Sequence, residues 1–354
     1  MKKIYQDSTF YLIIFILSYF IYIYPIEILN EFLFKEMANR RLSLYYSLLV
    51  SVIIIFYFRS KNTFYPIKIF VYEGMGIGFI SFWVVNVALI LNFFLNINTY
   101  KLGIITLILI IFIVSYGLLY GRLIFLKNLT ISSNKILNNY NFIFISDVHL
   151  GSNSINHLKN ILKKIENIQY DFLLIGGDLI DSSSFNISKL SIFNSINKPI
   201  FFVSGNHEYY VDNYKEKLNK LKDFGIKILN NESSILKEIN LVGIDDNQLP
   251  EQQLKHALKL IKNNNFNLLL IHKPSIWFKI KGNVDLMLSG HTHNGQIFPF
   301  NFFVRLKFKY KYGLYTNETS NLYVSSGSAC WGPKIRIGTR NEIIYINLKS
   351  KIKN

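Results

Sequence analysis

The sequence predicts a multi-pass α-helical membrane region followed by an α/β domain. Two observations support this fold class: four long apolar runs fill the first third of the 354 residues, and after Arg122 short apolar runs alternate with amphipathic stretches. The chain is 50% hydrophobic and only 17% charged, which excludes an intrinsically disordered protein. The single cysteine, Cys330, excludes a disulfide-stapled secreted module, and also zinc-finger and iron–sulfur sites, which need several thiolates.

Residues 1–121 are predicted to form a four-helix transmembrane region. A bilayer core of about 30 Å requires about 17–25 helical residues, and each apolar run is long enough to cross it. The runs cover residues 10–29, 42–58, 74–95 and 102–121. The first run has no small-residue cleavage site, so we expect it to be retained rather than removed as a signal peptide. This region has no histidine and only five acidic residues, which favours an anchor over a transporter.

The distribution of basic residues predicts the orientation in the membrane. Four spans place the N-terminus and the C-terminal domain on the same side. That side carries Lys2, Lys3, Arg59, Lys61, Lys68, Arg122, Lys127 and Lys135, and the opposite side carries Lys35, Arg40, Arg41 and Lys101. Since positive charge accumulates on the cytoplasmic side, we expect a cell (inner) membrane protein with a cytoplasmic C-terminal domain.

After a linker and first strand at 122–139, residues 140–354 are predicted to form the α/β domain. Apolar runs of strand length cover 142–146, 172–176, 200–204, 240–244, 268–272, 284–288, 322–326 and 343–348, and amphipathic stretches cover 155–168, 214–224 and 252–261. Residues 122–354 contain 30 Lys and Arg residues and 17 Asp and Glu residues, a net charge of +13. This charge favours phosphate-bearing substrates, anionic lipid or nucleic acid as partners, with an AT-rich genome as the alternative origin of the Lys and Asn usage.

Metal-ligand residue types follow five of the predicted strands, at the point where each strand ends. They are Asp147, His149, Asp178, Asn206, His272, His291 and His293. Ligand-binding groups gather at the carboxyl ends of strands in α/β sheets, so these side chains are expected to converge on one crevice. Carboxylate, amide and imidazole donors without a thiolate suit Mn, Fe, Zn or Ni. Seven donors with one bridging carboxylate make two four-donor sites, and two metals about 3.5–4 Å apart clamp the entering and leaving oxygens of a phosphoryl group.

The donors also occur in pairs separated by one residue. Asp147 and His149 form one pair, and His291 and His293 form the other. In an extended segment, residues two apart lie on the same face, so each pair is expected to reach one metal ion or two adjacent ones.

Taken in order, these motifs resemble the calcineurin-like metallophosphoesterase superfamily over residues 140–347. The series is Asp147-x-His149, Gly177-Asp178-x-x-Asp181, Gly205-Asn206-His207-Glu208, His272 and Gly290-His291-x-His293. The resemblance implies a four-layer α/β/β/α sandwich with two divalent metal ions. It assigns the first metal to Asp147, His149, Asp178 and His293, and the second to Asp178 as bridge, Asn206, His272 and His291.

The same resemblance implies a mechanism. A metal-bridging hydroxide attacks phosphorus, and His207 stabilises or protonates the leaving oxygen. Asp181 has no metal in this scheme, and we expect it to orient a ligand or a loop.

The C-terminal tail is similar to a narrower, membrane-associated bacterial branch, which includes UDP-2,3-diacylglucosamine pyrophosphatase-like enzymes. The shared features are Lys311-Tyr312-Gly313-Leu314-Tyr315, Leu322-Tyr323-Val324-Ser325-Ser326-Gly327, Gly332-Pro333-x-x-Arg336-x-Gly338 and Glu342-Ile343. The chain departs from this branch at Asn341, where Pro is usual, and at Ser328-Ala329-Cys330, where Gly-rich sequence is usual. Arg336 is expected to contact a substrate phosphate, with a structural ion pair as the alternative.

Residues 302–311 alternate basic and apolar side chains, which predicts an extended segment with one cationic and one apolar face. One interpretation is a half-buried edge strand with solvated lysines. The other is a loop that enters the lipid headgroup region and presents an anionic, lipid-linked substrate to the metals.

Together these features predict a membrane-anchored, metal-dependent phosphoric ester hydrolase. Its substrates would be phosphodiesters or pyrophosphates, including lipid-linked ones, and membrane lipid would be its other partner. The alternatives are a non-catalytic membrane scaffold or sensor with a phosphoesterase fold, and a metal-dependent nuclease. The complete donor set argues against the scaffold, and the lack of an RNA-binding or helix-turn-helix motif argues against specific nucleic-acid binding.

Overall fold

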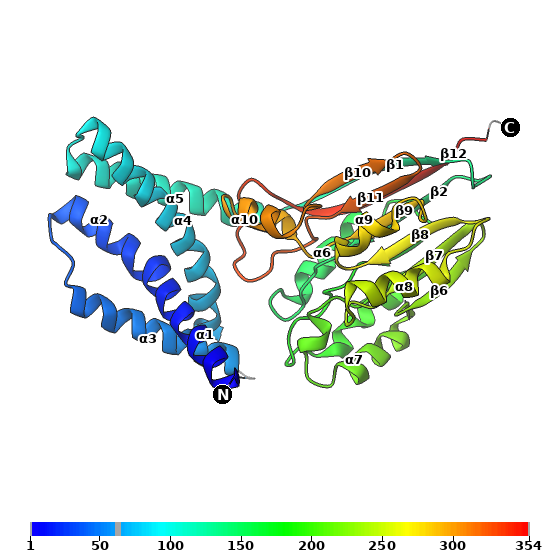
Figure 1. The fold of residues 1–354 in the computed structure, drawn as a ribbon, viewed down its shortest axis with the longest axis horizontal. Coiled ribbons are helices and arrows are strands. Elements are labelled where there is room, and N and C mark those ends of the chain that lie inside the picture. Colours follow the sequence, from blue (N-terminus) through cyan, green and yellow to red (C-terminus); the bar gives the residue numbers. More distant parts are fainter. Residues whose placement is uncertain (1, 61–64, 353–354) are drawn as a thin grey trace. The chain divides into compact units, whose positions relative to one another are not determined.

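The computed structural model describes residues 2–60 and 65–352, with side chains from residue 8. The chain divides into two compact units (Figure 1). The helical unit comprises Met1–Tyr120 with Gly332–Ile335, and the sheet unit comprises Gly121–Trp331 with Arg336–Asn354. Of the basic residues that predict the orientation, Lys61 lies outside the described residues, and only the backbone of Lys2 and Lys3 is described.

The helices of the N-terminal third confirm the four predicted apolar segments. They are α1 (Lys2–Ser18), the π-helix η1 (Tyr19–Ile23), α2 (Tyr24–Phe34), α3 (Arg40–Arg59), α4 (Tyr65–Leu95) and α5 (Thr99–Arg122). Among the described residues, four segments are long and apolar enough to cross a membrane: Ser8–Phe34, Arg40–Arg59, Tyr65–Leu95 and Thr99–Arg122. Most of their large apolar side chains are exposed, as expected for helices that face lipid.

Small polar residues line one side of α3 without leaving unsatisfied hydroxyl groups. Ser43, Ser47 and Ser51 are buried at a spacing of four residues. The hydroxyl of Ser47 donates to Ser43 O at 2.8 Å, and that of Ser51 donates to Ser47 O at 2.6 Å. Since small side chains let helices approach closely in lipid, this stripe is suited to helix packing within the helical unit.

The sheet unit contains two six-stranded sheets. The first has the order β1-β12-β2-β3-β4-β5 and the second has the order β10-β11-β9-β8-β7-β6. The strands of the first sheet are β1 (Ile124–Ser133), β2 (Tyr140–Ile145), β3 (Phe172–Ile175), β4 (Ile200–Phe202), β5 (Ile226–Ile228) and β12 (Asn341–Ser350). Those of the second are β6 (Glu232–Leu236), β7 (Ile239–Ile244), β8 (Phe266–Ile271), β9 (Leu286–Ser289), β10 (Gly313–Asn317) and β11 (Ser320–Val324).

Parallel pairing brings the strand ends that carry polar residues to one edge of each sheet. Strands β2, β3, β4 and β5 are parallel neighbours in the first sheet, and β7, β8, β9 and β11 are parallel neighbours in the second. Antiparallel strands flank these parallel groups, because β12 pairs with β2, β6 with β7 and β10 with β11. The carboxyl ends within each parallel group therefore lie side by side.

Helices cover the outer face of each sheet. The first sheet packs against α6 (Ile155–Ile165), the 3-10 helices η2 (Ile187–Ser195) and η4 (Lys222–Phe224), and α7 (Tyr214–Leu221); the second packs against α8 (Pro250–Leu260), η5 (Pro274–Ile276) and α9 (Trp277–Ile280). The remaining short elements are η3 (Glu208–Tyr210), η6 (His293–Gly295) and α10 (Phe300–Lys307). This arrangement confirms the predicted layers, a helical layer on each side of two stacked sheets.

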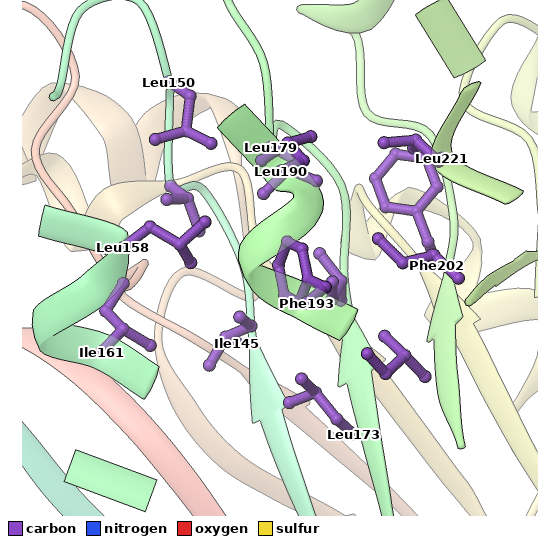
Figure 2. Close-up of a cluster of buried hydrophobic side chains, with 14 of the residues drawn as sticks. Ile145, Leu150, Leu158, Ile161, Leu173, Leu179, Leu190, Phe193, Phe202 and Leu221 are labelled. Carbon is purple, nitrogen blue, oxygen red and sulfur yellow. The ribbon is translucent and has the colours of Figure 1, made fainter. Parts of the chain in front are cut away.

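Alternation along each strand explains why both faces of a sheet are buried. In β2, Ile143 and Ile145 point into the cluster beneath the helices, which also contains Leu158 of α6 (Figure 2). Phe142 and Phe144 point the other way, into the cluster between the two sheets. Successive side chains of a strand face opposite sides, so a strand that is apolar throughout can be buried on both faces.

The extended segment predicted for residues 302–311 is wrong, because the structure forms helix α10 at Phe300–Lys307. A strand there would need a partner for its backbone, whereas a helix pairs its own groups, and Phe308 N donates to Val304 O at 2.8 Å. Apolar side chains also recur three residues apart at Phe300, Phe303 and Leu306. In such a short segment this helical spacing coexists with the alternation, so the pattern does not discriminate between them.

Candidate metal centre

Five loops that follow β2, β3, β4, β8 and β9 meet at the carboxyl edges of the two sheets. Backbone hydrogen bonds join neighbouring loops, since Asp147 N donates to Gly177 O at 3.0 Å and Gly290 N donates to His272 O at 2.9 Å. The two sheets are also joined here, because His291 N donates to the Asp147 carboxylate at 3.0 Å. The loops thus form one hydrogen-bonded edge on which the polar side chains converge.

The backbone turns sharply at five of the seven candidate ligands. Asp147, His149, Asp178, His291 and His293 have φ values of 55°, 50°, 52°, 73° and 48°. These residues therefore do not lie in extended segments, and the extended backbone expected for the pairs is wrong. Asp147 and His149 still lie in one group of possible ligands, and His291 and His293 lie in two groups. Left-handed backbone at a non-glycine residue costs about 1–3 kcal/mol and persists where the surroundings enforce it, as functional sites often do.

Glycine lets the backbone approach both carboxylates closely. A Cβ atom on Gly205 would overlap the Asp178 carboxylate, and a Cβ atom on Gly290 would overlap the Asp147 carboxylate. Any larger residue at either position would push a carboxylate away from the other donors.

The first group of donors consists of Asp147, His149 and His293. The Nε2 atoms of the two histidines are 3.1 Å apart. Asp147 Oδ1 lies 3.6 Å from His293 Nε2 and 4.0 Å from His149 Nε2. Ligands about 2.1 Å from one cation lie about 3–4 Å from one another, so this group matches a single-ion site.

The second group consists of Asp178, His272 and His291. His272 Nε2 lies 3.1 Å from Asp178 Oδ2 and 3.3 Å from His291 Nδ1. The same Asp178 Oδ2 lies 3.9 Å from His149 Nε2 of the first group. Asp178 therefore stands between the two groups, as a carboxylate that bridges two cations would.

Asn206 adds an unsatisfied oxygen to this edge. Its Oδ1 atom is buried and accepts no hydrogen bond from any described residue. Its neighbour His207 is fixed to Asp178, because His207 N donates to Asp178 Oδ1 at 2.9 Å. A buried amide oxygen without a donor is costly unless a cation binds it, so this atom fits a metal site.

The electrostatics of the imidazoles also suit metal binding. Burial lowers the pKa of His291 to about 2 and holds the pKa of His293 well below its usual value, so both are neutral at pH 7, the form that binds metals. Burial opposes a cation at His272, but the Asp178 carboxylate outweighs it and raises the pKa of His272 to about 10. Buried acidic charge here attracts a positive group, which a divalent cation provides.

Asp181 lies behind His149. Asp181 Oδ2 is 3.5 Å from His149 Nδ1, and Asp181 Oδ1 accepts a hydrogen bond from Ser152 N at 2.8 Å. The ring is thereby held with Nε2 toward Asp147 and Asp178. This is the arrangement expected of a residue that orients a ligand.

His207 occupies the open side of the centre. Its Nε2 lies 3.9 Å from Asp178 Oδ2, and its side chain is 17% exposed. The rings of Tyr210 and Trp331 lie 5.4 and 5.6 Å from its ring, and both are exposed. His207 is therefore the histidine at this edge placed to meet a bound molecule.

Arg336 has surroundings different from those expected of a phosphate contact. It is 0% exposed. Its guanidinium donates to the carbonyl oxygens of His293, Ser326 and Ala329 at 2.7–2.8 Å and to Asn341 Oδ1 at 2.8 Å. Arg336 thus fixes the loop that carries His293, and Asn341 is one of its partners.

Glu208 was missed as a functional residue by the sequence reasoning. It is buried, and its carboxylate accepts hydrogen bonds from Asp178 N at 3.0 Å, Ile180 N at 2.9 Å and Gly205 N at 2.8 Å. Burial and the charge of Asp178 raise the pKa of Glu208 to about 7. The available signal was its place at the end of the Gly205-Asn206-His207-Glu208 motif, but spacing does not show which loops a buried carboxylate joins.

The region that carries these donors is similar to known proteins. Residues 140–295 match the model of the calcineurin-like phosphoesterase family. The chain is 36% identical over 239 residues to an uncharacterised metallophosphoesterase of Campylobacter jejuni, a match that covers 64% of this chain and 63% of that protein. The chain therefore spans just under two thirds of that relative's length.

Two further relatives extend the comparison. An uncharacterised metallophosphoesterase of Aquifex aeolicus is 31% identical over 219 residues, which cover 58% of this chain and 84% of that protein. A bovine protein named transmembrane protein with metallophosphoesterase domain is 29% identical over 245 residues, which cover 60% of this chain and 54% of that protein. On this family match and these relatives, the chain belongs to the calcineurin-like phosphoesterase family.

Proposed function

We propose that this chain is a membrane-anchored phosphoesterase with two metal ions that hydrolyses phosphodiester or pyrophosphate bonds in lipid-linked substrates. The observation that carries the proposal is the position of Asp178 between two groups of donors. Asp147, His149, Asp178 and His293 would hold one cation, and Asp178, Asn206, His272 and His291 would hold the other. Two such cations supply Lewis-acid polarisation of the phosphoryl oxygens and a water nucleophile at neutral pH.

The chain's own residues would divide the remaining tasks. Asp181 lies behind the imidazole of His149, and Arg336 donates to the backbone carbonyl of His293 and lies 3.4 Å from its Nδ1. His207 is partly exposed beside Asp178, where its ring N–H can donate to the leaving oxygen. Burial lowers the pKa of His207 to about 4, so its ring is neutral at pH 7 and its role is to donate that hydrogen bond. Loss of such a group should slow turnover by about 10²–10⁴-fold.

Lipid linkage of the substrate is supported by how short the tether is. Helix α5 ends at Arg122 and β1 begins at Ile124, so Leu123 alone separates a candidate membrane span from the first sheet. Asn341 Nδ2 donates to Gly121 O at 2.8 Å and Asn341 Oδ1 accepts from Arg336 Nε at 2.8 Å, and Arg336 bonds to the carbonyl of the candidate ligand His293. Within the sheet unit, three hydrogen bonds thus connect Gly121, at its beginning, to the backbone of the candidate ligand His293.

The location and orientation complete the proposal. The excess of basic residues on the side of the C-terminal domain supports a cell (inner) membrane protein with a cytoplasmic catalytic domain. The similarity of the C-terminal tail to the membrane-associated branch supports pyrophosphates of the UDP-2,3-diacylglucosamine type as the substrate class.

A substrate panel tests the function. Full-length protein in lipid nanodiscs with Mn²⁺ is assayed on a lipid-linked pyrophosphate, a nucleotide pyrophosphate, a soluble phosphodiester, a phosphomonoester and DNA. We expect hydrolysis of the lipid-linked pyrophosphate to be fastest and to be lost in Asp178→Asn. Faster cleavage of DNA would favour the nuclease, and no metal-dependent hydrolysis of any substrate would favour a scaffold.

Accessibility to protease tests the orientation separately. A protease added to intact cells should leave the C-terminal domain uncut, whereas a protease added to inverted membranes should digest it. Digestion in intact cells would refute the cytoplasmic orientation without affecting the proposed chemistry.

A further inference from the structure

Helix α10 exposes an unusual number of large apolar side chains for a segment of the sheet unit. We define the α10 surface as Phe298, Phe300, Phe302, Phe303 and Leu306, all of which are exposed. Leu306 is 86% exposed and Phe302 is 58% exposed, and no residue of α10 is buried. Clustered apolar exposure of this kind marks a surface that binds another apolar phase.

The charge around the α10 surface indicates what that phase is. Arg305, Lys307 and Lys309 lie within or directly after the helix, and the sequence has no acidic residue between Asp285 and Glu318. An occupant must therefore offer apolar contact and negative charge together. Anionic lipid at the bilayer interface does so, because short amphipathic helices with basic and aromatic residues lie in that layer.

The bilayer is also available to this helix. The sheet unit begins at Gly121, and α5, which is long and apolar enough to span a membrane, ends at Arg122. A tether this short keeps the sheet unit at the membrane surface, which raises the effective concentration of lipid for any weak binding site on it.

Helix α10 is attached on both sides to the loop of the metal centre. On its N-terminal side, Gly295 packs so closely on Asn301 that a Cβ atom would overlap it. On its C-terminal side, the ring of Phe308 lies 5.2 Å from that of His291, and Thr292 Oγ1 donates to Lys311 O at 2.5 Å. Figure 1 shows α10 outside the strands of both sheets.

We propose that α10 is an interfacial membrane-binding helix, which inserts the α10 surface among anionic lipid headgroups while Arg305, Lys307 and Lys309 bind the lipid phosphates. Because α10 is fixed to the loop of His291 and His293, this binding places the metal centre next to the headgroups. The binding does not require hydrolysis, so it can be tested apart from the proposed function.

Lipid-dependent fluorescence quenching tests the proposal on the full-length chain. Leu306→Cys is labelled with a small fluorophore in nanodiscs that contain spin-labelled lipid, either zwitterionic or with 30% phosphatidylglycerol. The matched control is Leu249→Cys, also an exposed leucine of the sheet unit, and unsubstituted protein reports the background from the buried Cys330. We expect at least twofold quenching at position 306 in the anionic discs and none at position 249.

A charge variant and a second quencher complete the design. Combining Leu306→Cys with Arg305→Gln, Lys307→Gln and Lys309→Gln should reduce the quenching to its value in zwitterionic discs. Equal quenching at positions 306 and 249, or quenching unaffected by the three substitutions, would overturn the proposal. A label at 306 that is shielded from aqueous iodide but not quenched by lipid would show a protein occupant, such as a second copy, and would overturn it as well.

Metal-dependent hydrolysis of a soluble phosphodiester by the same samples separates the two proposals. Quenching without hydrolysis would leave the helix assignment standing and count against the proposed function. Hydrolysis without quenching would support the proposed function and count against the helix assignment. Leu306 has no role at the metal centre, so its variant should hydrolyse the soluble substrate at the unsubstituted rate, which also confirms that it is folded.

Discussion

Replacement of Glu208 should destabilise the sheet unit and loosen the metal centre together. Its carboxylate accepts three buried backbone N–H groups, with Oε2 bonded to Asp178 N and Gly205 N and Oε1 bonded to Ile180 N. In Glu208→Gln the amide oxygen can keep the first two, while its NH₂ group faces the N–H of Ile180. One buried donor left without an acceptor costs about 1–3 kcal/mol.

Glu208→Ala leaves all three N–H donors without an acceptor. At the same cost for each donor, the free energy of unfolding falls by about 3–9 kcal/mol at most. For a unit of this size, 1 kcal/mol corresponds to a shift of about 2–4 °C in Tm. We therefore expect Glu208→Gln to lower Tm by about 2–12 °C and Glu208→Ala to lower it further. Because Glu208 fixes the loops of Asp178 and Asn206, both variants should also bind Mn²⁺ about 10–100-fold more weakly.

Thermal unfolding of the full-length protein in detergent provides the measurement. Trp83→Phe in the background leaves Trp277 and Trp331, both in the sheet unit, as the fluorescent reporters. Glu166→Gln, an exposed glutamate at the end of α6, is the matched control and should leave Tm nearly unchanged. If Glu208→Ala unfolds at the Tm of the control and binds Mn²⁺ equally well, the bracing role of Glu208 is refuted.

Three further predictions concern the centre and the core. His207→Ala should retain both metals by elemental analysis and lose about 10²–10⁴-fold in kcat, and loss of metal from this variant would instead identify His207 as a ligand. Gly290→Ala should weaken Mn²⁺ binding measured by calorimetry, because the Cβ of the alanine displaces the Asp147 carboxylate. An unchanged affinity would show that the loop shifts to accommodate this Cβ. Phe193→Ala, in the cluster of Figure 2, should cost about 3–5 kcal/mol in urea unfolding, whereas a cost below about 1 kcal/mol would mean that neighbouring side chains refill the space.

The sequence predicts the layers of this fold well because burial dictates its pattern. A span needs an apolar run of fixed length, and a strand buried on both faces needs an uninterrupted apolar run, so both kinds of element are visible without a structure. The short strands β5 and β6 were not predicted, since three to five residues with charged members carry little pattern. The prediction of an extended segment in place of helix α10 was wrong because eight residues can match both the alternation of a strand and the spacing of a helix.

The residue types of the site could be predicted from the sequence, but the contacts that hold these residues in place could not. Parallel strands bring the loops of Asp147 and Asp178 to one edge, so their proximity follows from the topology. The topology does not predict the left-handed backbone at His149 or the buried position of Arg336, because both depend on loop contacts between distant segments. Arg336 in the tail motifs suggests a contact with a substrate phosphate, yet here the backbone carbonyls of three residues surround it.

The most direct test of the account is the metal content of the purified full-length protein together with the position of each ion. Protein loaded with Mn²⁺ and freed of excess metal should contain two ions per chain, and anomalous diffraction should place one on each side of the Asp178 carboxylate. Asp178→Asn should bind fewer than two under the same conditions. A single ion, or two ions away from Asp178, would contradict the shared centre on which the proposed hydrolysis rests.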